Sequence, residues 1–294
     1  MVKTARTDLA YERISANMTD GIDYQEKTMG VCKLHSLHIH TKEAERVCHI
    51  AKGRYHTLLL PAVTSLDESE REDILAQISL CLTDMAASLL GTSVMQGKRI
   101  LVTGLGNRAN TVDSLGPLIA DRVHATAHLK DEHPDLLATL ACAEIAIFSP
   151  GSTACIGMQS SALIAAAVQH FKPHLVIAAD ALAARSFSRL ATTIQFTDAG
   201  ISPGSGMGSS RARLHRAALG CPIIAIGVPT VTDTVTLIHD TFASAGIKPP
   251  RAWRKKAALT DKCFVCPPDS DQIIDRFADM IATAINRTFG VPDL

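Results

Sequence analysis

The chain has 294 residues, of which 47% are hydrophobic and 20% are charged, so it can bury a sizeable core and is not an intrinsically disordered chain. Its 29 basic residues balance its 29 acidic residues, and this neutrality gives no overall field that would favour nucleic acid or an anionic membrane. No apolar run has the length that a membrane span requires, and the first residues lack the apolar core of a signal peptide. We therefore expect an intracellular protein without direct nucleic-acid or membrane contacts.

The first part of the chain mixes polar and β-forming segments. Residues 1–30 carry charges of both signs and are expected to form a surface tail, whereas residues 31–60 are a candidate β subregion. Residues 69–90 follow the period of an amphipathic helix, with Ser69 as the expected N-cap and Gly91 after its last turn. A buried strand at 99–103 then leads into a glycine loop and a helix expected from Ser114 to about His128.

Strands and helices alternate in the rest of the chain. We expect strands near 143–148, 175–179, 192–196 and 222–228, and helices near 160–170, 209–219, 232–244 and 271–289. This alternation predicts an α/β fold of phosphorylase/hydrolase-like type, with a mostly parallel, doubly wound sheet and helices on both faces.

The loop after the strand at 99–103 contains Gly104 and Gly106, which suggests a dinucleotide site with Ala109 in place of the third glycine. Polar residues 107–111 separate this loop from the helix, so no helix N-terminus would face a pyrophosphate. A P-loop is excluded because no GK[ST] follows the glycines. We predict no nucleotide cofactor.

Two aspartates occupy the ends of predicted strands or the loops that follow them. Asp113 stands where the helix after the glycine loop begins, a place where Asp is also a favoured N-cap. Asp180 follows the strand at 175–179, and Arg185 is a candidate partner for it. Since the carboxyl ends of parallel strands meet at one edge of a sheet, the two carboxylates are expected to share a crevice. Such a pair can activate water and protonate a leaving amine.

Other residues offer competing chemistry. Ser152 and Ser205 do not stand in GxSxG after a strand, which argues against a serine hydrolase. His38 and His40 share one face of a predicted strand and are a candidate metal pair, although we favour a solvent-facing strand without a metal. The eight cysteines, including the CxxC at 263–266, are expected to be reduced thiols rather than disulfides, and no partner pair for a zinc site is evident.

Several long segments together resemble the germination proteases of spore-forming bacteria. These segments span most of the chain: RTDLAYE (6–12), GLGNRANTVDSLGP (104–117), SPG (149–151), AADALAARS (178–186), TIQFTDAGISPGSGMG (193–208), PIIAIGVPTVTDTVT (222–236) and AINR (284–287). The resemblance implies an atypical aspartic-type endopeptidase that begins the degradation of small acid-soluble spore proteins during germination. It also implies a fold similar to that of the hydrogenase-maturation proteases.

The resemblance places the two essential aspartates of the family on Asp113 and Asp180. It further implies a self-processing zymogen, a homotetramer and a location in the cytoplasm of the spore core. The matching self-processing bond is Asp8–Leu9, which makes residues 1–8 a candidate propeptide and residues 9–294 a single peptidase domain. The sequence departs from the family where Ser202 stands in place of an expected His, and the candidate propeptide is shorter than expected.

From these residues we expect Asp113 and Asp180 to share a proton, with interchangeable roles in activating water and protonating the amine. Asn107 and the backbone amides of Gly204 and Gly206 are candidates for stabilising the oxyanion. Asp198 and Asp233 are reserve candidates that we expect to serve in loop closure and helix capping. A metal-dependent maturation peptidase and a non-enzymatic ligand-binding domain remain the alternatives.

Overall fold

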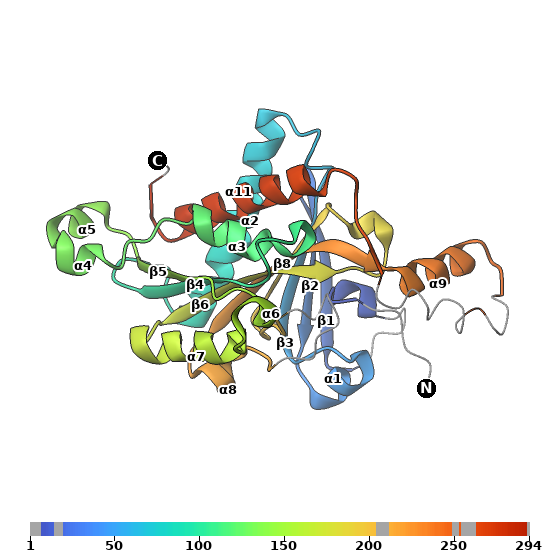
Figure 1. Cartoon of the computed structure of the whole chain (residues 1–294), viewed down its shortest axis with the longest axis horizontal. Helices are drawn as coiled ribbons and strands as arrows, with labels where there is room; N and C mark the ends of the chain where they lie inside the picture. Colours follow the sequence, from blue (N-terminus) through green and yellow to red (C-terminus); the bar gives the residue numbers. More distant parts are fainter. Residues whose placement is uncertain (1–6, 15–19, 204–211, 249–252, 254–262, 293–294) are drawn as a thin grey trace.

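The computed structural model describes residues 7–14, 20–203, 212–248, 253 and 263–292. One sheet runs through the molecule, and helices cover it (Figure 1). Its strands are β1 (Ile22–Met29), β2 (Cys32–Ile39), β3 (Gly53–Leu59), β4 (Arg99–Gly104), β5 (Glu144–Phe148), β6 (Leu175–Ala183), β7 (Thr193–Thr197), β8 (Ile223–Asp233) and β9 (Phe264–Val265). The α-helices are α1 (Lys42–Cys48), α2 (Glu68–Leu90), α3 (Leu115–Arg122), α4 (Leu129–Glu132), α5 (Pro134–Leu140), α6 (Thr153–Ile156), α7 (Ser160–Phe171), α8 (Arg216–Leu219), α9 (Thr234–Ser244) and α11 (Ser270–Thr288). The 3₁₀ turns are η1 (Tyr11–Arg13), η2 (Thr111–Asp113) and η3 (Phe187–Arg189).

The sheet is mixed, so the prediction of a mostly parallel sheet was wrong. Its order is β1-β2-β3-β7-β8-β6-β4-β5, with β9 added to the end of β8. The pairs β8–β6, β6–β4 and β4–β5 are parallel, whereas the pairs on the β1 side of β8 are antiparallel. Antiparallel neighbours can be joined by short turns and need no helical crossover. The alternation of strands and helices along the sequence therefore predicts strand direction only in the parallel half of the sheet.

Helices cover both faces of the parallel half, as the sequence predicts. On one face, α2, α3 and α11 contribute Ile78, Ile119 and Ile281 to the largest apolar core. On the other face, α7 and α8 contribute Ile164 and Leu219 to a second core. Figure 1 shows these two helical layers on opposite sides of the strands. Every residue of β6 is buried, which agrees with a strand covered on both faces.

The long helix α2 has its N-cap two residues before the predicted one. Asp67 is the N-cap, and its side chain and that of Glu70 form a reciprocal capping box, so Ser69 does not cap the helix. By length and composition α2 could cross a membrane, with a mean hydropathy of 1.4. One face of it, however, is buried in the core and packs against α11. We therefore interpret α2 as a core helix.

The first described residues are not a surface tail. Leu9 and Ala10 are buried, and β1 pairs along its whole length with β2 as the edge strand of the sheet. The exposed residues of β1 are mostly polar, as is usual for an edge strand, and this hid the strand from a search for apolar periodicity. Two helices are also shorter than expected. The helix after the glycine loop ends at Arg122, and within the expected helix 209–219 the described helical residues are Arg216–Leu219.

Candidate active site

Asp180 lies inside β6, near the end of its parallel pairing. The side chains of Val176, Ala178 and Leu182 belong to the core on the α7 side, and Asp180 shares their face because alternate residues of a strand point the same way. The carboxyl group is 1% exposed, and its Oδ1 accepts a hydrogen bond from the Ala181 backbone N–H at 2.9 Å. A carboxyl group is costly to bury, so Asp180 stays a candidate functional residue.

Asp113 ends η2, on the segment that leads from β4 into α3. Its carbonyl oxygen accepts a hydrogen bond from the Asn107 backbone N–H at 2.9 Å. This contact requires Gly106, since a Cβ there would lie 2.1 Å from the same oxygen. η2 also packs against β6 and β8, and Thr230 Oγ1 of β8 donates to the Val112 carbonyl at 2.6 Å.

The close approach of α3 to β6 brings these two segments to the same rim. Leu105 N–H donates to the Ala179 carbonyl oxygen at 2.8 Å, which joins the β4 loop to the residue before Asp180. Gly116 in the first turn of α3 has no room for a side chain, because a Cβ would lie 2.2 Å from the Leu105 carbonyl oxygen and 2.5 Å from that of Ala179. The segments that carry Asp113 and Asp180 are therefore packed together.

Three other residues were predicted to contribute to the site, namely Asn107, Gly204 and Gly206, and Ser202 was noted as a departure from the family. Asn107 Oδ1 accepts a hydrogen bond from the Ala109 N–H at 3.1 Å, so this side chain stabilises its own turn. Gly204 and Gly206 lie outside the described residues. Ser202 is half-buried and lines the cavity described below.

The two reserve aspartates serve the structure in the expected ways. Asp198 accepts hydrogen bonds from the backbone N–H and the guanidinium of Arg54, both at 2.7 Å, and thereby ties the end of β7 to β3. Asp233 is the N-cap of α9, and its Oδ1 accepts a hydrogen bond from the Thr236 N–H at 2.9 Å. Arg185, a predicted partner of Asp180, instead forms an ion pair with Asp240 at 2.9 Å.

The N-terminal segment 7–13 is held tightly against the ends of β6 and β7. Asp8 N–H donates to the Ala183 carbonyl at 2.9 Å, and Asp8 Oδ2 accepts from the Ala183 N–H at 2.9 Å. The Glu12 carboxylate accepts from the N–H groups of Arg185 at 2.7 Å and Ser186 at 2.9 Å. Several residues of the RTDLAYE segment (6–12) thus make contacts that hold the segment in place.

Gln195 of β7 was missed by the sequence analysis, and it contacts the same segment. Its Oε1 accepts from the Ala10 N–H at 2.7 Å and its Nε2 donates to the Asp8 carbonyl at 3.2 Å. Gln195 is paired in register with Gly227 of β8, which in turn is paired with Asp180. The three residues form one row across the sheet, on the same face. A polar glutamine between the apolar residues Ile194 and Phe196 of a buried strand was the signal that could have revealed it.

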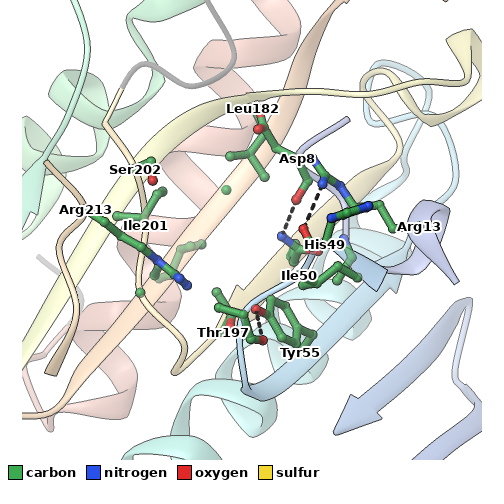
Figure 2. A pocket seen from close by; sticks show the side chains of 17 residues that line it. Asp8, Arg13, His49, Ile50, Tyr55, Leu182, Thr197, Ile201, Ser202 and Arg213 are labelled. Carbon is green, nitrogen blue, oxygen red and sulfur yellow. Dashed lines mark hydrogen bonds between the residues drawn. The ribbon is translucent and has the colours of Figure 1, made fainter. Parts of the chain in front are cut away.

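A cavity of about 280 Å³ lies beside this row. Figure 2 shows Asp8 and Arg13 on one side of it, Ser202 and Arg213 on the other, and Tyr55 with Thr197 at its lower end. Arg13 is committed to the carbonyls of Thr7 and His49, and Arg213 donates to the Ala199 carbonyl at 2.7 Å. Burial raises the pKa of Tyr55 to about 12, so its hydroxyl stays protonated at neutral pH. The cavity is therefore polar, with two arginines on its walls.

Comparison with known proteins assigns the sequence of this chain to a family. The sequence model of the germination protease family matches residues 2–246. The germination protease of Clostridium acetobutylicum is 34% identical over 248 residues, which cover 82% of this chain and 74% of that protein. The germination protease of Clostridium tetani is 30% identical over 312 residues, which cover 96% and 94%. That of Bacillus subtilis is 35% identical over 245 residues, which cover 80% and 65%.

Among solved structures, the [NiFe] hydrogenase maturation protease HycI from Thermococcus kodakarensis superposes with a TM-score of 0.33 at 19% identity, and covers 66% of this chain and 96% of that one. The assignment depends on the sequence matches, which extend over most of the chain and include the segments that carry Asp8, Asp113 and Asp180. The chain belongs to the germination protease family.

Proposed function

We propose that the protein is an endopeptidase of atypical aspartic type that begins the degradation of small acid-soluble spore proteins in the spore core. Asp113 and Asp180 form its acid–base pair, and no metal ion or other cofactor takes part. The enzyme is made as a homotetrameric zymogen that cuts its own Asp8–Leu9 bond. It makes no direct contact with nucleic acid or membrane.

The observation that carries this proposal is the position of the Asp8–Leu9 bond relative to Asp180. Asp8 pairs with Ala183, three residues along β6 from Asp180, which corresponds to about 10 Å at the usual rise of a strand. Gln195, which holds the Asp8 carbonyl, is two strands from Asp180 in the same row, again about 10 Å. Both estimates put the Asp8–Leu9 bond about 10 Å from Asp180 at the same end of the sheet. Gln195, which contacts the Asp8 carbonyl, lies on the same face as Asp180.

A separation of this size is larger than the hydrogen-bond reach that a general base requires. We therefore interpret the described arrangement as the uncut state, in which the segment is held beside the aspartates rather than across them. Cleavage then requires the segment to shift by several ångströms. After cleavage and release, the same row is open to an extended stretch of substrate chain.

In the mechanism, one aspartate is ionised and takes a proton from the attacking water, while the other is protonated and gives its proton to the leaving amine. Burial favours the protonated form of a carboxyl group such as Asp180, whereas neighbouring N–H donors favour the ionised form. Carboxyl groups that share a proton do not have residue-specific pKa values, so neither role is assigned to one of them. Flexible substrates suit this site because an unfolded chain can lie extended along the row.

The test compares Asp113→Asn and Asp180→Asn with Asp121→Asn, an exposed carboxylate that forms an ion pair with Arg108. Two readouts are needed: cleavage of a small acid-soluble spore protein in trans, and mass spectrometry of the N-terminus for cleavage after Asp8. We expect both readouts to fall by at least about a thousandfold in the first two variants and to be unchanged in the third. Full activity of a folded Asp113→Asn or Asp180→Asn variant would remove the acid–base pair.

A further inference from the structure

A cluster of metal-binding side chains lies on the strand pair β1–β2, away from the proposed catalytic aspartates. Asp23 of β1 is paired in register with His38 of β2, and His40 follows two residues later on the same face. Antiparallel pairing thus brings the carboxylate to the two imidazoles that the sequence places on one face of a strand. The carboxylate partner is set by the register and could not be identified from the sequence.

The geometry of the three side chains suits a metal ion. One ligand atom from each residue lies within 4.8 Å of the others. His40 Nε2 is 2.5 Å from Asp23 Oδ2, and the imidazole rings of His38 and His40 have their centroids 3.7 Å apart. Two ligands of a tetrahedral Zn²⁺ at about 2.0–2.1 Å from the metal are about 3.4 Å from each other. The 2.5 Å between His40 and Asp23 is shorter than this distance and the 4.8 Å limit is longer, so ligand atoms must move by about 1 Å to surround one ion.

Arg54, a cationic side chain that acts on His38, is itself paired with a carboxylate. Arg54, which is paired in register with His38 on the other side of β2, has its guanidinium bound to Asp198 at 2.7 Å and to Ser88 at 2.8 Å. A metal that binds His40 through Nε2 takes the place of the hydrogen bond to Asp23, and the imidazole carries its proton on Nδ1.

We propose that Asp23, His38 and His40 form a binding site for a transition-metal dication of the Zn²⁺ class, with water in the remaining position. Two imidazoles and one carboxylate match the ligand preference of Zn²⁺, whereas Mg²⁺ and Ca²⁺ prefer oxygen ligands alone. The ion lies apart from the proposed catalytic aspartates. β2 is four strands from β6 in the sheet, about 19 Å at the usual strand spacing, so its ion cannot activate water at Asp180.

The ion would join the edge strand β1 to β2 in addition to their backbone hydrogen bonds. Asp23 is exposed and comes from the outermost strand, so the bound metal adds a cross-link near the open end of the hairpin. A ligand that binds only the folded chain raises the free energy of unfolding by mass action, so Zn²⁺ is expected to raise the melting temperature.

The test is calorimetric titration of the metal-free full-length chain with Zn²⁺, repeated on His38→Ala/His40→Ala, on Asp23→Asn, and on the control His170→Ala, an exposed histidine of α7. We expect one equivalent of Zn²⁺ in the wild type and the control, none at this site in the double variant, and binding weakened by at least about tenfold in Asp23→Asn. Circular dichroism checks that each variant is folded.

A Cys263→Ser/Cys266→Ser variant and a Co²⁺ spectrum exclude the cysteines as the source of the signal, because thiolate ligands give Co²⁺ a strong near-ultraviolet band that imidazole and carboxylate do not. We expect the cysteine variant to keep its equivalent of Zn²⁺ and the Co²⁺ complex to lack that band. The proposal would be overturned by any of three results: no Zn²⁺ binding in the wild type, unchanged binding in the His38/His40 double variant, or loss of binding in the cysteine variant.

Discussion

Gln195 holds the main chain of the N-terminal segment on both sides of the Asp8–Leu9 bond. Its Nε2 donates to the Asp8 carbonyl at 3.2 Å, while its Oε1 accepts from the Ala10 N–H at 2.7 Å. A glutamine amide can pair in this way because it offers one donor and one acceptor side by side. The residue therefore binds the backbone of this segment and not its side chains.

Replacing Gln195 by Glu should loosen this segment. The carboxylate keeps an acceptor for Ala10 but loses the donor to Asp8, and it brings a negative charge against a carbonyl oxygen in a buried place. We expect the amide hydrogens of residues 8–12 to exchange at least about tenfold faster, corresponding to about 1.4 kcal/mol. The measurement is hydrogen exchange by mass spectrometry, with Gln159→Glu on the surface as the matched control. Unchanged protection of residues 8–12 would show that Gln195 does not hold them.

Gly116→Ala should separate the two segments that carry Asp113 and Asp180. The added Cβ would meet the carbonyl oxygens of Leu105 and Ala179 at 2.2 Å and 2.5 Å, and backbone atoms cannot move aside cheaply. We expect a loss of about 3 kcal/mol or more in the free energy of unfolding. Urea denaturation measures it.

Gly157→Ala is the matched comparison for that substitution. Nothing lies within 4 Å of a Cβ at Gly157, so the only cost is its positive φ of 70°, about 1–2 kcal/mol. A loss at Gly116 no larger than that at Gly157 would mean that α3 can withdraw from β6 without difficulty.

The capping box of α2 gives a prediction on stability alone. Asp67 Oδ1 accepts from the Glu70 N–H at 2.8 Å, and Glu70 Oε2 accepts from the Asp67 N–H at 3.1 Å. Asp67→Ala should lower the free energy of unfolding by about 1 kcal/mol. Ser69→Ala should change it by less than about 0.5 kcal/mol, because Ser69 lies inside the first turn and does not cap the helix. Equal losses in the two variants would contradict this assignment of the cap.

His35 makes stability sensitive to acid. It is buried beside Tyr11 and Tyr24, with Tyr24 Oη 2.7 Å from its Nδ1, and the Tyr11 ring belongs to the N-terminal segment. Burial lowers its pKa below the ordinary value of 6.5, against a smaller raising effect of Glu26. Between these two pKa values the unfolded chain binds more protons than the folded chain, so stability is full above about pH 6.5 and falls as the pH decreases below it.

His35→Gln should therefore reduce the loss of stability between about pH 7.5 and pH 5.5. The loss should not disappear, because the pKa values of His38, His56 and His174 are also lowered, in each case chiefly by burial. Urea denaturation at each pH measures the effect, and His170→Gln, on the surface, is the control. If His35→Gln loses as much stability as the wild type over this range, His35 is not a source of the acid sensitivity.

The sequence alone determined the buried strands and the long amphipathic helices, because their signals are local. The apolar run of β8 and the period of α2 depend only on neighbouring residues, and both elements formed close to their predicted positions. The family was also identified from continuous segments, which the comparisons confirm. Asp113 and Asp180 remain predictions in their catalytic roles, on segments that the fold packs together.

The tertiary structure decided what depends on pairing between distant segments. Strand pairing sets the antiparallel direction of β3 and β7 and makes β1 the edge strand. It also brings Asp23 to His38 and His40. The sequence of a single polar strand does not indicate its partner or its register. The role of Gln195 was hidden for the same reason, since its partners are more than 180 residues away in the chain. Hydrogen bonds between such segments are formed only once the sheet has assembled, so only the folded chain reveals them.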